Sequence, residues 1–401
     1  MHSRTGRWAS IFCVQVVADV SGREGALDVS VVIPCLNEAE TVAICIAKAK
    51  SAMARSNLSG EVIVVDNGST DGSAEIAAEA GAKVINERRR GYGNAYLAGF
   101  AAARGQYIVM GDADDTYDFD QVDSFVERLA QGADLVMGSR FKGSIHKGAM
   151  PALHRYVGNP LLTGVLNLFY RSGVSDAHCG MRGFRRDALE GLDLRMPGME
   201  FASEMVIRAS KAGLRIEEMP IEYHPRRGES KLKSFRDGWR HLRFLLVHSP
   251  TYLFLVPGIG LFAIGLLAML TILANLSVLG RQWDLHAMIA AAMLAIAGTQ
   301  IVGLGLGARA YSVHHLGERD RLFDRFDGKL RLEHGLLIGA LALLGGVVVA
   351  TIVVVNWIDR GFGALGEERL AVLSLTLIVV GLQIIFTSFF LSIVGLRRRD
   401  R

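Results

Sequence analysis

The chain has 401 residues, half of them apolar, and its 44 Lys and Arg nearly balance its 40 Asp and Glu. So high an apolar fraction excludes a largely disordered protein, because these side chains can bury a core. The charges are unevenly spread, however. Beyond residue 250 they stand outside four long uncharged runs, so the average composition conceals a soluble part joined to a membrane part.

The first 26 residues allow more than one interpretation. Arg4 and Arg7 precede a short apolar stretch, residues 8 to 18, which imitates a signal peptide. Such a signal would export the next domain against the distribution of cations described below. We therefore expect residues 1 to 26 to form a loosely ordered extension or an interfacial segment.

Runs rich in Val and Ile alternate with helical patterns between residues 27 and 230, where we expect one α/β domain. The predicted strands are residues 29–33, 61–65, 82–85, 107–110 and 135–137, and the predicted helices are residues 39–53, 73–80, 94–103 and 119–130. Strands that alternate with helices favour a mainly parallel sheet covered on both faces. Ligands of such sheets bind beyond the carboxyl ends of the strands, where the polar motifs of this sequence also stand.

Two of these motifs follow the first and second strands. Residues 34 to 38 read Pro-Cys-Leu-Asn-Glu, and residues 66 to 72 read Asp-Asn-Gly-Ser-Thr-Asp-Gly. A turn at Gly68 and a helix cap at Thr70 or Asp71 would explain the second motif without any function. An acid in the place of Asp66 also suits a nucleobase imide or a ribose hydroxyl, so both interpretations stay open.

The fourth strand leads into Gly-Asp-Ala-Asp-Asp, residues 111 to 115. Carboxylates this close repel each other, and a divalent cation relieves that cost. Hard oxygen ligands favour Mg²⁺ or Mn²⁺. We therefore expect Asp112 and Asp114 to hold one of these ions, with a solvated acidic loop as the alternative.

A basic segment, residues 88 to 90, and Gly91 precede the third predicted helix. The segment has neither the spacing of a dinucleotide fingerprint nor a Walker lysine, so both of those sites are excluded. A basic helix start with a glycine hinge suits a diphosphate. A solvated run of charge is the alternative for these arginines.

Residues 231 to 249 alternate cations with apolar side chains, among them Arg240, Arg243 and Phe244. This pattern predicts a basic amphipathic helix that lies on an anionic membrane surface. The apolar stretch of residues 161 to 170 has the same possible use. A plain structural linker is the alternative for both segments.

Four uncharged runs follow, at residues 251–280, 285–308, 335–358 and 370–396. Each exceeds the roughly 20 residues that span a bilayer, and buried helices of soluble proteins seldom run so long without charge. We expect a membrane domain over residues 250 to 397, with helices at about 251–276, 286–308, 335–357 and 370–396.

The cations gather in the connection after the second run and in the tail, residues 397 to 401. The positive-inside rule then places the soluble domain and both termini in the cytoplasm, at a bacterial-type inner or plasma membrane.

In order along the chain, these motifs resemble the inverting GT-A glycosyltransferases of family two, especially dolichyl-phosphate mannose synthases and bacterial polyprenyl-phosphate sugar transferases. The likeness covers about residues 28 to 235. Besides the motifs at residues 31–38, 64–72 and 111–114, it includes Gly-Ser-Arg-Phe at 138–141, the stretch 176–182, Ser-Glu at 203–204 and Gly-Glu-Ser-Lys-Leu at 228–232.

The resemblance implies a GT-A domain followed by four transmembrane helices, and it implies roles for particular residues. The donor nucleotide sugar would contact Pro34, Glu38, Asp66, Gly91, Asp112 and Ala113. The acceptor phosphate would contact Arg140, His178, Arg182, Arg227 and Lys231. The implied catalytic residues are Asp112, Asp114, Arg140, Arg182 and Lys231. The family often has Gln where this chain has Thr116, and this departure sets the chain apart from the mannose synthases.

The chemistry of a polyprenyl phosphate needs little more than these parts. Its phosphate oxygen is already anionic, so the site has to align two phosphates and neutralise the leaving one. Arginine suits this task because its planar fork binds phosphate oxygens in pairs. A surface ion pair is the alternative use of Arg182 and Lys231, and a local hydrogen bond that of His178.

The sequence therefore predicts a membrane-bound enzyme that transfers glucose or mannose from a UDP- or GDP-sugar to an undecaprenyl- or dolichyl-type phosphate, with inversion. A processive polysaccharide synthase is a second possibility, although the Gln-x-x-Arg-Trp stretch of such enzymes is missing. A non-catalytic lipid-binding scaffold is a third, disfavoured by the intact Asp112, Asp114 and Arg182. The expected partners are the nucleotide sugar, the polyprenyl phosphate, the bilayer and a possible second copy of the chain, with no nucleic acid.

Overall fold

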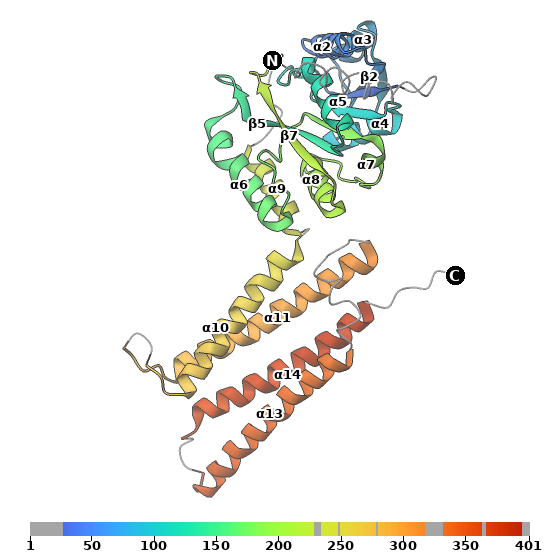
Figure 1. The fold of residues 1–401 in the computed structure, drawn as a ribbon. Coiled ribbons are helices and arrows are strands. Elements are labelled where there is room, and N and C mark those ends of the chain that lie inside the picture. The colour runs from blue at the N-terminus through green and yellow to red at the C-terminus, as the bar shows by residue number, and fades with distance from the viewer. Residues whose placement is uncertain are drawn as a thin grey trace, which may run out of the picture. The chain divides into compact units, whose positions relative to one another are not determined.

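A computed structural model describes residues 27–227, 234–247, 249–277, 280–316, 332–362 and 366–394. The chain divides into two compact units, Met1–Leu245 and Leu246–Arg401 (Figure 1). The predicted extension of residues 1 to 26 lies outside the described residues.

The first unit contains a mixed sheet of seven strands, in the order β3-β2-β1-β4-β6-β5-β7. The strands are β1 (Val29–Cys35), β2 (Gly60–Asp66), β3 (Lys83–Asn86), β4 (Tyr107–Met110), β5 (Leu135–Ile145), β6 (Arg182–Arg185) and β7 (Ile216–Tyr223). Every neighbouring pair is parallel except β4–β6 and β5–β6. The predicted, mainly parallel sheet is confirmed, with one reversed strand inside it.

Helices cover both faces of this sheet, as predicted (Figure 1). Side chains alternate along a strand, so Val31 and Ile33 of β1 enter one apolar cluster and Val32 enters the other. The first cluster receives α2 (Val42–Arg55), α3 (Ser73–Glu79) and α5 (Val122–Ala130). The second receives α4 (Tyr92–Ala102), α6 (Asn159–Tyr170), α7 (Arg186–Glu190), α8 (Phe201–Ala212) and α9 (Ser234–Val247).

Two strands of the sheet, β6 and β7, are absent from the sequence prediction. β6 has only four residues and begins with a charged residue, so it has no apolar run that would mark it. Along β7, buried Met219 and Ile221 alternate with exposed Pro220 and Glu222, the pattern of a strand with one polar face. Pairing with neighbouring strands, rather than local composition, makes these segments extended.

Both segments expected at the membrane surface have apolar side chains in the core of the first unit. In α6, Leu166 is buried while Leu161 and Leu168 are exposed. In α9, Phe244 and Leu245 are buried in the second cluster. Each helix thus packs one side against the sheet domain, and membrane contact by the rest stays a prediction.

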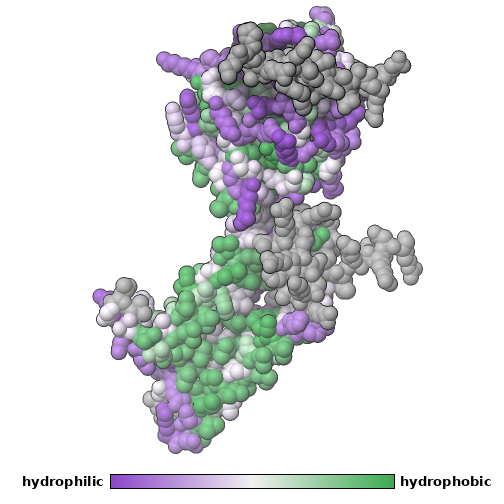
Figure 2. Space-filling model, in the orientation of Figure 1, coloured by the Kyte–Doolittle hydropathy of each residue, from purple (hydrophilic) through white to green (hydrophobic). Residues whose placement is uncertain are grey.

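The second unit consists of long apolar helices: η3 (Thr251–Leu255) with α10 (Val256–Leu273), α11 (Leu285–Leu316), α13 (Leu332–Asp359) and α14 (Glu368–Val394). Four segments are long and apolar enough to cross a membrane, namely Thr251–Leu273, Leu285–Val313, Leu332–Asp359 and Glu368–Val394. Apolar residues cover most of their visible outer surface (Figure 2). The four predicted membrane helices are confirmed.

Small residues let these helices approach closely, which is typical of membrane bundles. A Cβ on Gly298 of α11 would lie 2.7 Å from the carbonyl oxygen of Gly258 in α10. A Cβ on Gly381 of α14 would lie 2.7 Å from the carbonyl oxygen of Gly339 in α13. Larger side chains at these contacts would force the helices apart.

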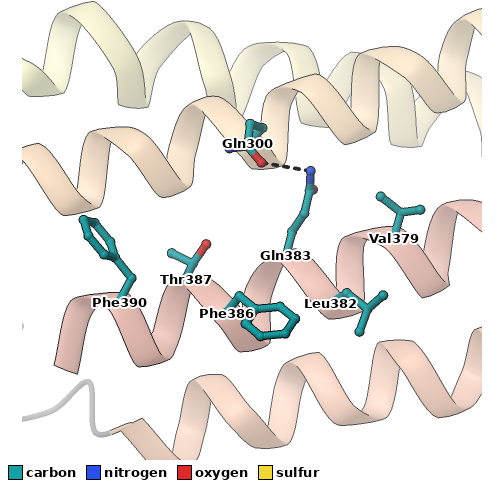
Figure 3. A pocket seen from close by; sticks show the side chains of 7 residues that line it. All are labelled: Gln300, Val379, Leu382, Gln383, Phe386, Thr387 and Phe390. Atoms are coloured by element: carbon teal, nitrogen blue, oxygen red, sulfur yellow. Dashed lines mark hydrogen bonds between the residues drawn. The ribbon is translucent and has the colours of Figure 1, made fainter. Parts of the chain in front are cut away.

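A groove of about 400 Å³ lies along α14, beside α11 (Figure 3). Gln383 of α14 donates from Nε2 to Oε1 of Gln300 on α11 at 3.1 Å. The other lining residues are Val379, Leu382, Phe386, Thr387 and Phe390, all on α14. The two helices are therefore joined by a polar contact in a groove lined mainly by apolar side chains.

Candidate active site

Three of the sequence motifs meet at one edge of the sheet. β1 ends at Cys35, β2 ends at Asp66 and β4 ends at Met110, and the three strands are parallel neighbours. The order of strands along the chain reverses at β1, between β2 and β4. In open α/β sheets, ligands bind outside the carboxyl ends of the strands at such a reversal. The acids at this edge therefore stand where the fold provides a ligand site.

The carboxyl group of Asp112, just beyond β4, is held by two tyrosines of α4. The hydroxyls of Tyr92 and Tyr96 each donate to its Oδ1, at 3.0 and 3.1 Å. Burial and, after it, the charge of Asp114 raise the pKa of Asp112 from 3.8 to about 7. A Cβ on Gly180 would lie 2.8 Å from Oδ2, so only glycine leaves room for this carboxylate.

The carboxylate of Asp114 lies between a threonine and an arginine. Its Oδ1 accepts hydrogen bonds from the hydroxyl of Thr116 at 2.6 Å and from the amide of Thr116 at 3.2 Å. Its Oδ2 lies 3.4 Å from Nη1 of Arg226, whose Nη2 pairs with Oε1 of Glu38. Arg226 therefore links the acid that follows β1 to the acid that follows β4.

Asp112 and Asp114 fit a divalent cation by the chemistry of their donors. Both offer hard carboxylate oxygens, the ligands that Mg²⁺ and Mn²⁺ prefer. Tyrosine and threonine donors approach the Oδ1 atoms, while Oδ2 of Asp114 faces the cation of Arg226. A positive charge here lowers the cost of ionising the buried Asp112. Thr116, the departure from the family pattern, orients Asp114.

Asp66, at the end of β2, is buried and organises the turn that follows it. Its carboxylate accepts hydrogen bonds from the amides of Gly68 and Ser69, at 3.2 and 3.1 Å. The turn is tied to the end of β1, since the amide of Thr70 donates to Oδ1 of Asn37 at 2.8 Å. The turn predicted from the sequence is therefore present, and it fixes the position of Asp66.

Gly91 lies at the start of α4 and is enclosed by another loop. Its φ is +142°, and a Cβ there would lie 2.3 Å from the carbonyl oxygen of Pro197. The same oxygen accepts hydrogen bonds from the amides of Gly93 and Asn94, at 2.9 and 3.3 Å. The start of α4, expected to approach a diphosphate, is thus already capped by protein. A diphosphate would have to displace Pro197.

Glu204, on α8, holds this capping loop in place. Its carboxylate accepts hydrogen bonds from the amides of Arg195, at 3.0 Å, and Met196, at 2.8 Å. It also pairs with Arg208 one helical turn along, at 2.9 Å. The Ser-Glu motif of the sequence therefore acts by positioning the loop that covers α4.

Among the arginines before Gly91, Arg89 forms an exposed ion pair with Glu87 at 2.9 Å.

The guanidinium group of Arg140, in the middle of β5, is paired with a carboxylate. It contacts Asp176 through Nε and Nη2, at 2.7 and 2.8 Å, and both residues are buried. Although burial opposes it, the charge of Arg140 holds the pKa of Asp176 below its usual value. A phosphate at Arg140 would have to compete with this buried pair, and the expected phosphate contact of Arg140 stays a prediction.

Arg182, the first residue of β6, is fully buried. Its guanidinium donates to three backbone carbonyls, those of Cys179, Ala202 and Ala177, at 2.9, 2.7 and 2.9 Å. These bonds hold the 176–182 stretch against α8. The charged group of Arg182 thus faces the interior of the protein, and the binding of phosphate by Arg182 stays a prediction.

His178 is half-buried, with its polar atoms turned away from solvent. Both of its ring nitrogens are buried without a hydrogen-bond partner among the described residues, and its ring lies 4.8 Å from that of His241. Burial lowers the pKa of His178 to about 3, so the imidazole is neutral near pH 7. A neutral ring supplies no positive charge to a phosphate, and the expected contact of His178 with the acceptor stays a prediction.

The remaining predicted residues lie in different places. Arg227 is exposed, with Nε 3.9 Å from Oδ2 of Asp115, and so it faces the Asp112–Asp114 loop from solvent. Pro34 is half-buried near the end of β1, and Ala113 is buried. Lys231 and its Gly-Glu-Ser-Lys-Leu motif lie outside the described residues.

Sequence reasoning missed three residues of this site. Arg226 was passed over because two adjacent arginines look alike in sequence, and Arg227 matched the resemblance. Tyr96 lies in the predicted helix of residues 94–103 and Tyr92 just before it, and their spacing of four residues puts both hydroxyls on one side of α4. That spacing is the signal by which they could have been found.

Comparison with known proteins matches both parts of the chain to glycosyltransferases. Residues 30–193 match the model of glycosyl transferase family 2, and residues 306–395 match the model of the glycosyltransferase family 2 C-terminal transmembrane region. The chain is 46% identical over 367 residues to the low-salt glycan biosynthesis hexosyltransferase Agl6 of Haloferax volcanii, covering 91% of this chain and 89% of that protein.

A second relative is the dolichyl-phosphate hexose transferase of Haloferax volcanii, 37% identical over 180 residues, which cover 44% of this chain and 76% of that protein. Among solved structures, the chain is similar to glucosyl-3-phosphoglycerate synthase from Mycobacterium tuberculosis in complex with Mn²⁺, UDP and glucosyl-3-phosphoglycerate. The TM-score is 0.46 at 22% identity, over 62% of this chain and 84% of that one.

Proposed function

Because the chain belongs to glycosyltransferase family 2 and has four transmembrane helices, we propose that this membrane glycosyltransferase moves a hexose from a nucleotide sugar to a polyprenyl phosphate. The observation that carries the proposal is the carboxylate pair Asp112 and Asp114, beyond β4 and beside the ends of β1 and β2. The 37% identical dolichyl-phosphate hexose transferase supports the class of acceptor.

The donor would bind across the ends of β1 and β2. Asp66 is held by the turn amides in a fixed orientation, which suits recognition of a base imide or a ribose hydroxyl. Glu38 and Pro34 would line the same pocket from β1. Ala113 and Gly91 would border the diphosphate, which would have to displace the carbonyl of Pro197 to reach Gly91. The donor is a UDP- or GDP-hexose, with glucose or mannose as the sugar.

Asp112 and Asp114 would hold Mg²⁺ or Mn²⁺. A bound cation of this kind supplies charge neutralisation for the departing diphosphate. Arg226 reaches Asp114 and Glu38 and would add positive charge to the same place. Tyr92, Tyr96 and Thr116 keep the two carboxylates in position before the donor arrives.

The acceptor phosphate would be drawn to Arg227, which is exposed at the rim of the carboxylate loop, and to Lys231. One of its oxygens attacks the anomeric carbon, the bond from that carbon to the diphosphate breaks, and the nucleoside diphosphate leaves. The configuration inverts in this single displacement. The attacking oxygen is already ionised, so the reaction releases no proton and requires no general base.

The membrane helices would keep the enzyme where its lipid acceptor is. The positive-inside rule places the sheet domain and both termini in the cytoplasm, where nucleotide sugars are available. Reporter tags at residues 1 and 401 test this orientation. Both tags should be inaccessible from outside intact cells, and an exposed tag at either end would contradict it.

The test of function uses the purified full chain in detergent with Mg²⁺ or Mn²⁺, undecaprenyl or dolichyl phosphate, and a panel of labelled UDP- and GDP-hexoses. A lipid product with one sugar is expected. Asp114→Ala should abolish it, whereas Asp118→Ala, on the same loop but paired with Lys48 at 3.6 Å, should retain activity within a few-fold. A long polymer would instead identify a polysaccharide synthase, and no product from any donor would refute the proposal.

A further inference from the structure

Two imidazoles and a carboxylate converge at the far end of the β5–β7 pair. Ser144 of β5 is paired with Glu222 of β7, and the amide of His146 donates to the carbonyl of Tyr223 at 3.0 Å. His224 follows β7 directly. The ligand atoms of His146, Glu222 and His224 all lie within 4.8 Å of one another. Backbone pairing between two strands therefore fixes the three side chains relative to each other.

The separations within this cluster match those of metal ligands. Oε2 of Glu222 lies 3.4 Å from Nε2 of His146 and 3.5 Å from Nε2 of His224. Both distances are longer than good hydrogen bonds to nitrogen, which are about 2.7–3.2 Å. Ligands at about 2.0–2.2 Å from a tetrahedral zinc ion are separated from one another by about 3.3–3.6 Å. The distances from one carboxylate oxygen to two imidazole nitrogens are thus those expected between ligands of a shared ion.

We propose that His146, Glu222 and His224 form a site for Zn²⁺ or a similar transition-metal ion, separate from the carboxylate pair at Asp112 and Asp114. Imidazole nitrogen favours zinc, cobalt and nickel, whereas Mg²⁺ prefers oxygen. The two imidazoles are stacked, with ring centroids 4.4 Å apart and planes at 17°, and Nε2 of each lies within 3.5 Å of Oε2 of Glu222. All three side chains are between about one third and one half exposed, which gives an ion access from solvent.

Three protein ligands leave a tetrahedral ion one open position. The site is therefore exchangeable, unlike a structural zinc site closed by four protein ligands.

An ion here would act on the active site through the chain that follows β7. The amide of His224 donates to the carbonyl of Thr116 at 2.9 Å, and the Thr116 hydroxyl holds Asp114. Two residues after His224, Arg226 pairs with Glu38 and Asp114. An ion that ties His224 to His146 would anchor this segment to β5 and so limit the movement of Arg226. The site is thus a means of tuning the transferase by a metal other than its own.

The test uses the full chain in detergent, without an affinity tag, stripped with chelator and then dialysed against Zn²⁺ in excess Mg²⁺. The wild type should bind one zinc ion per chain. The affinity for zinc should be at least about tenfold lower in His146→Gln and in His224→Gln. His154→Gln, outside the cluster, and Asp114→Ala, in the carboxylate pair, should bind zinc as the wild type does. Equal thermal unfolding midpoints confirm that the variants are folded.

Two further readouts locate the ion. Co²⁺ in place of Zn²⁺ should give a visible absorption band in the wild type that is lost in both cluster variants. Zinc should slow amide hydrogen exchange over residues 222 to 227 in the wild type but not in His224→Gln. Zinc binding that is unchanged in both histidine variants, or abolished in Asp114→Ala, would overturn the proposal.

Discussion

The raised pKa of Asp112 predicts that neutralising this residue stabilises the protein at alkaline pH. Burial and the charge of Asp114 raise its pKa from 3.8 to about 7 in the folded state. The folded state therefore binds the proton more tightly than the unfolded state does. The contribution of Asp112 to the free energy of unfolding is therefore highest below pH 4, and it declines as the pH rises from about 4 to about 7. Asp112→Asn resembles the protonated form and removes this penalty.

The size of the effect follows from the same two pKa values. A difference of about three units corresponds to on the order of 4 kcal/mol at pH 8. The new amide needs an acceptor of its own, which costs about 1–3 kcal/mol if it is unmet. The net gain of about 2 kcal/mol corresponds to a rise of about 4–8 °C in the thermal unfolding midpoint. At pH 5 the penalty is only on the order of 1–2 kcal/mol, and the cost of the amide cancels it.

The assay is thermal unfolding of wild type and Asp112→Asn in chelator at pH 8 and pH 5. The variant should melt higher at pH 8 and near the wild type at pH 5, while losing transferase activity at both. Added Mg²⁺ should stabilise the wild type at pH 8 and have little effect on the variant. Asp115→Asn is the matched control, and it should not stabilise, because Asp115 pairs with Lys48 at 2.8 Å. A midpoint of Asp112→Asn at or below the wild-type value at pH 8 would refute the reasoning.

Three further experiments test other parts of the structure. Arg226→Ala should reduce kcat/KM at least about a hundredfold, since it removes the positive charge that we propose to lie beside the reacting phosphates. It should also lower the thermal midpoint, whereas Arg227→Ala, at an exposed pair, should leave that midpoint within about 2 °C. Arg182→Met should lower the stability by about 3 kcal/mol or more, because three buried carbonyls lose their donor; a wild-type melting temperature with reduced activity would return Arg182 to the phosphate. A double-mutant cycle of Gln300→Leu and Gln383→Leu in detergent should show a coupling energy of about 0.6 kcal/mol, and additive effects would mean that the amide pair does not join α11 to α14.

Strands with strong local signals were predicted from the sequence, and strands that depend on their neighbours were not. The run at Val29–Cys35 is buried on both faces and so is apolar at every position except Ser30. β6 is extended because it pairs with β4 and β5, which lie far from it in sequence. No local pattern of four residues with arginine at both ends indicates such pairing.

The acids of the site followed the same rule. Asp66, Asp112 and Asp114 could be placed from the sequence, because each follows a strand and the carboxyl ends of parallel strands share one edge. The positions of the cations could not be predicted from the sequence. Whether an arginine faces a ligand or the interior depends on what surrounds its long side chain, and in sequence the buried Arg182 looks no different from Arg226.

The sequence by itself determined the division into a sheet domain and a membrane domain, the mainly parallel sheet and the edge at which its acids gather. These properties arise from periodicity, from hydropathy and from the order of strands, which are local or additive along the chain. The tertiary structure alone decided that Arg182 and Arg140 position backbone and Asp176, that Arg226 joins Glu38 to Asp114, and that His146 meets Glu222 and His224. Those contacts join residues from separate elements, so they exist only once the sheet has paired and the loops have packed.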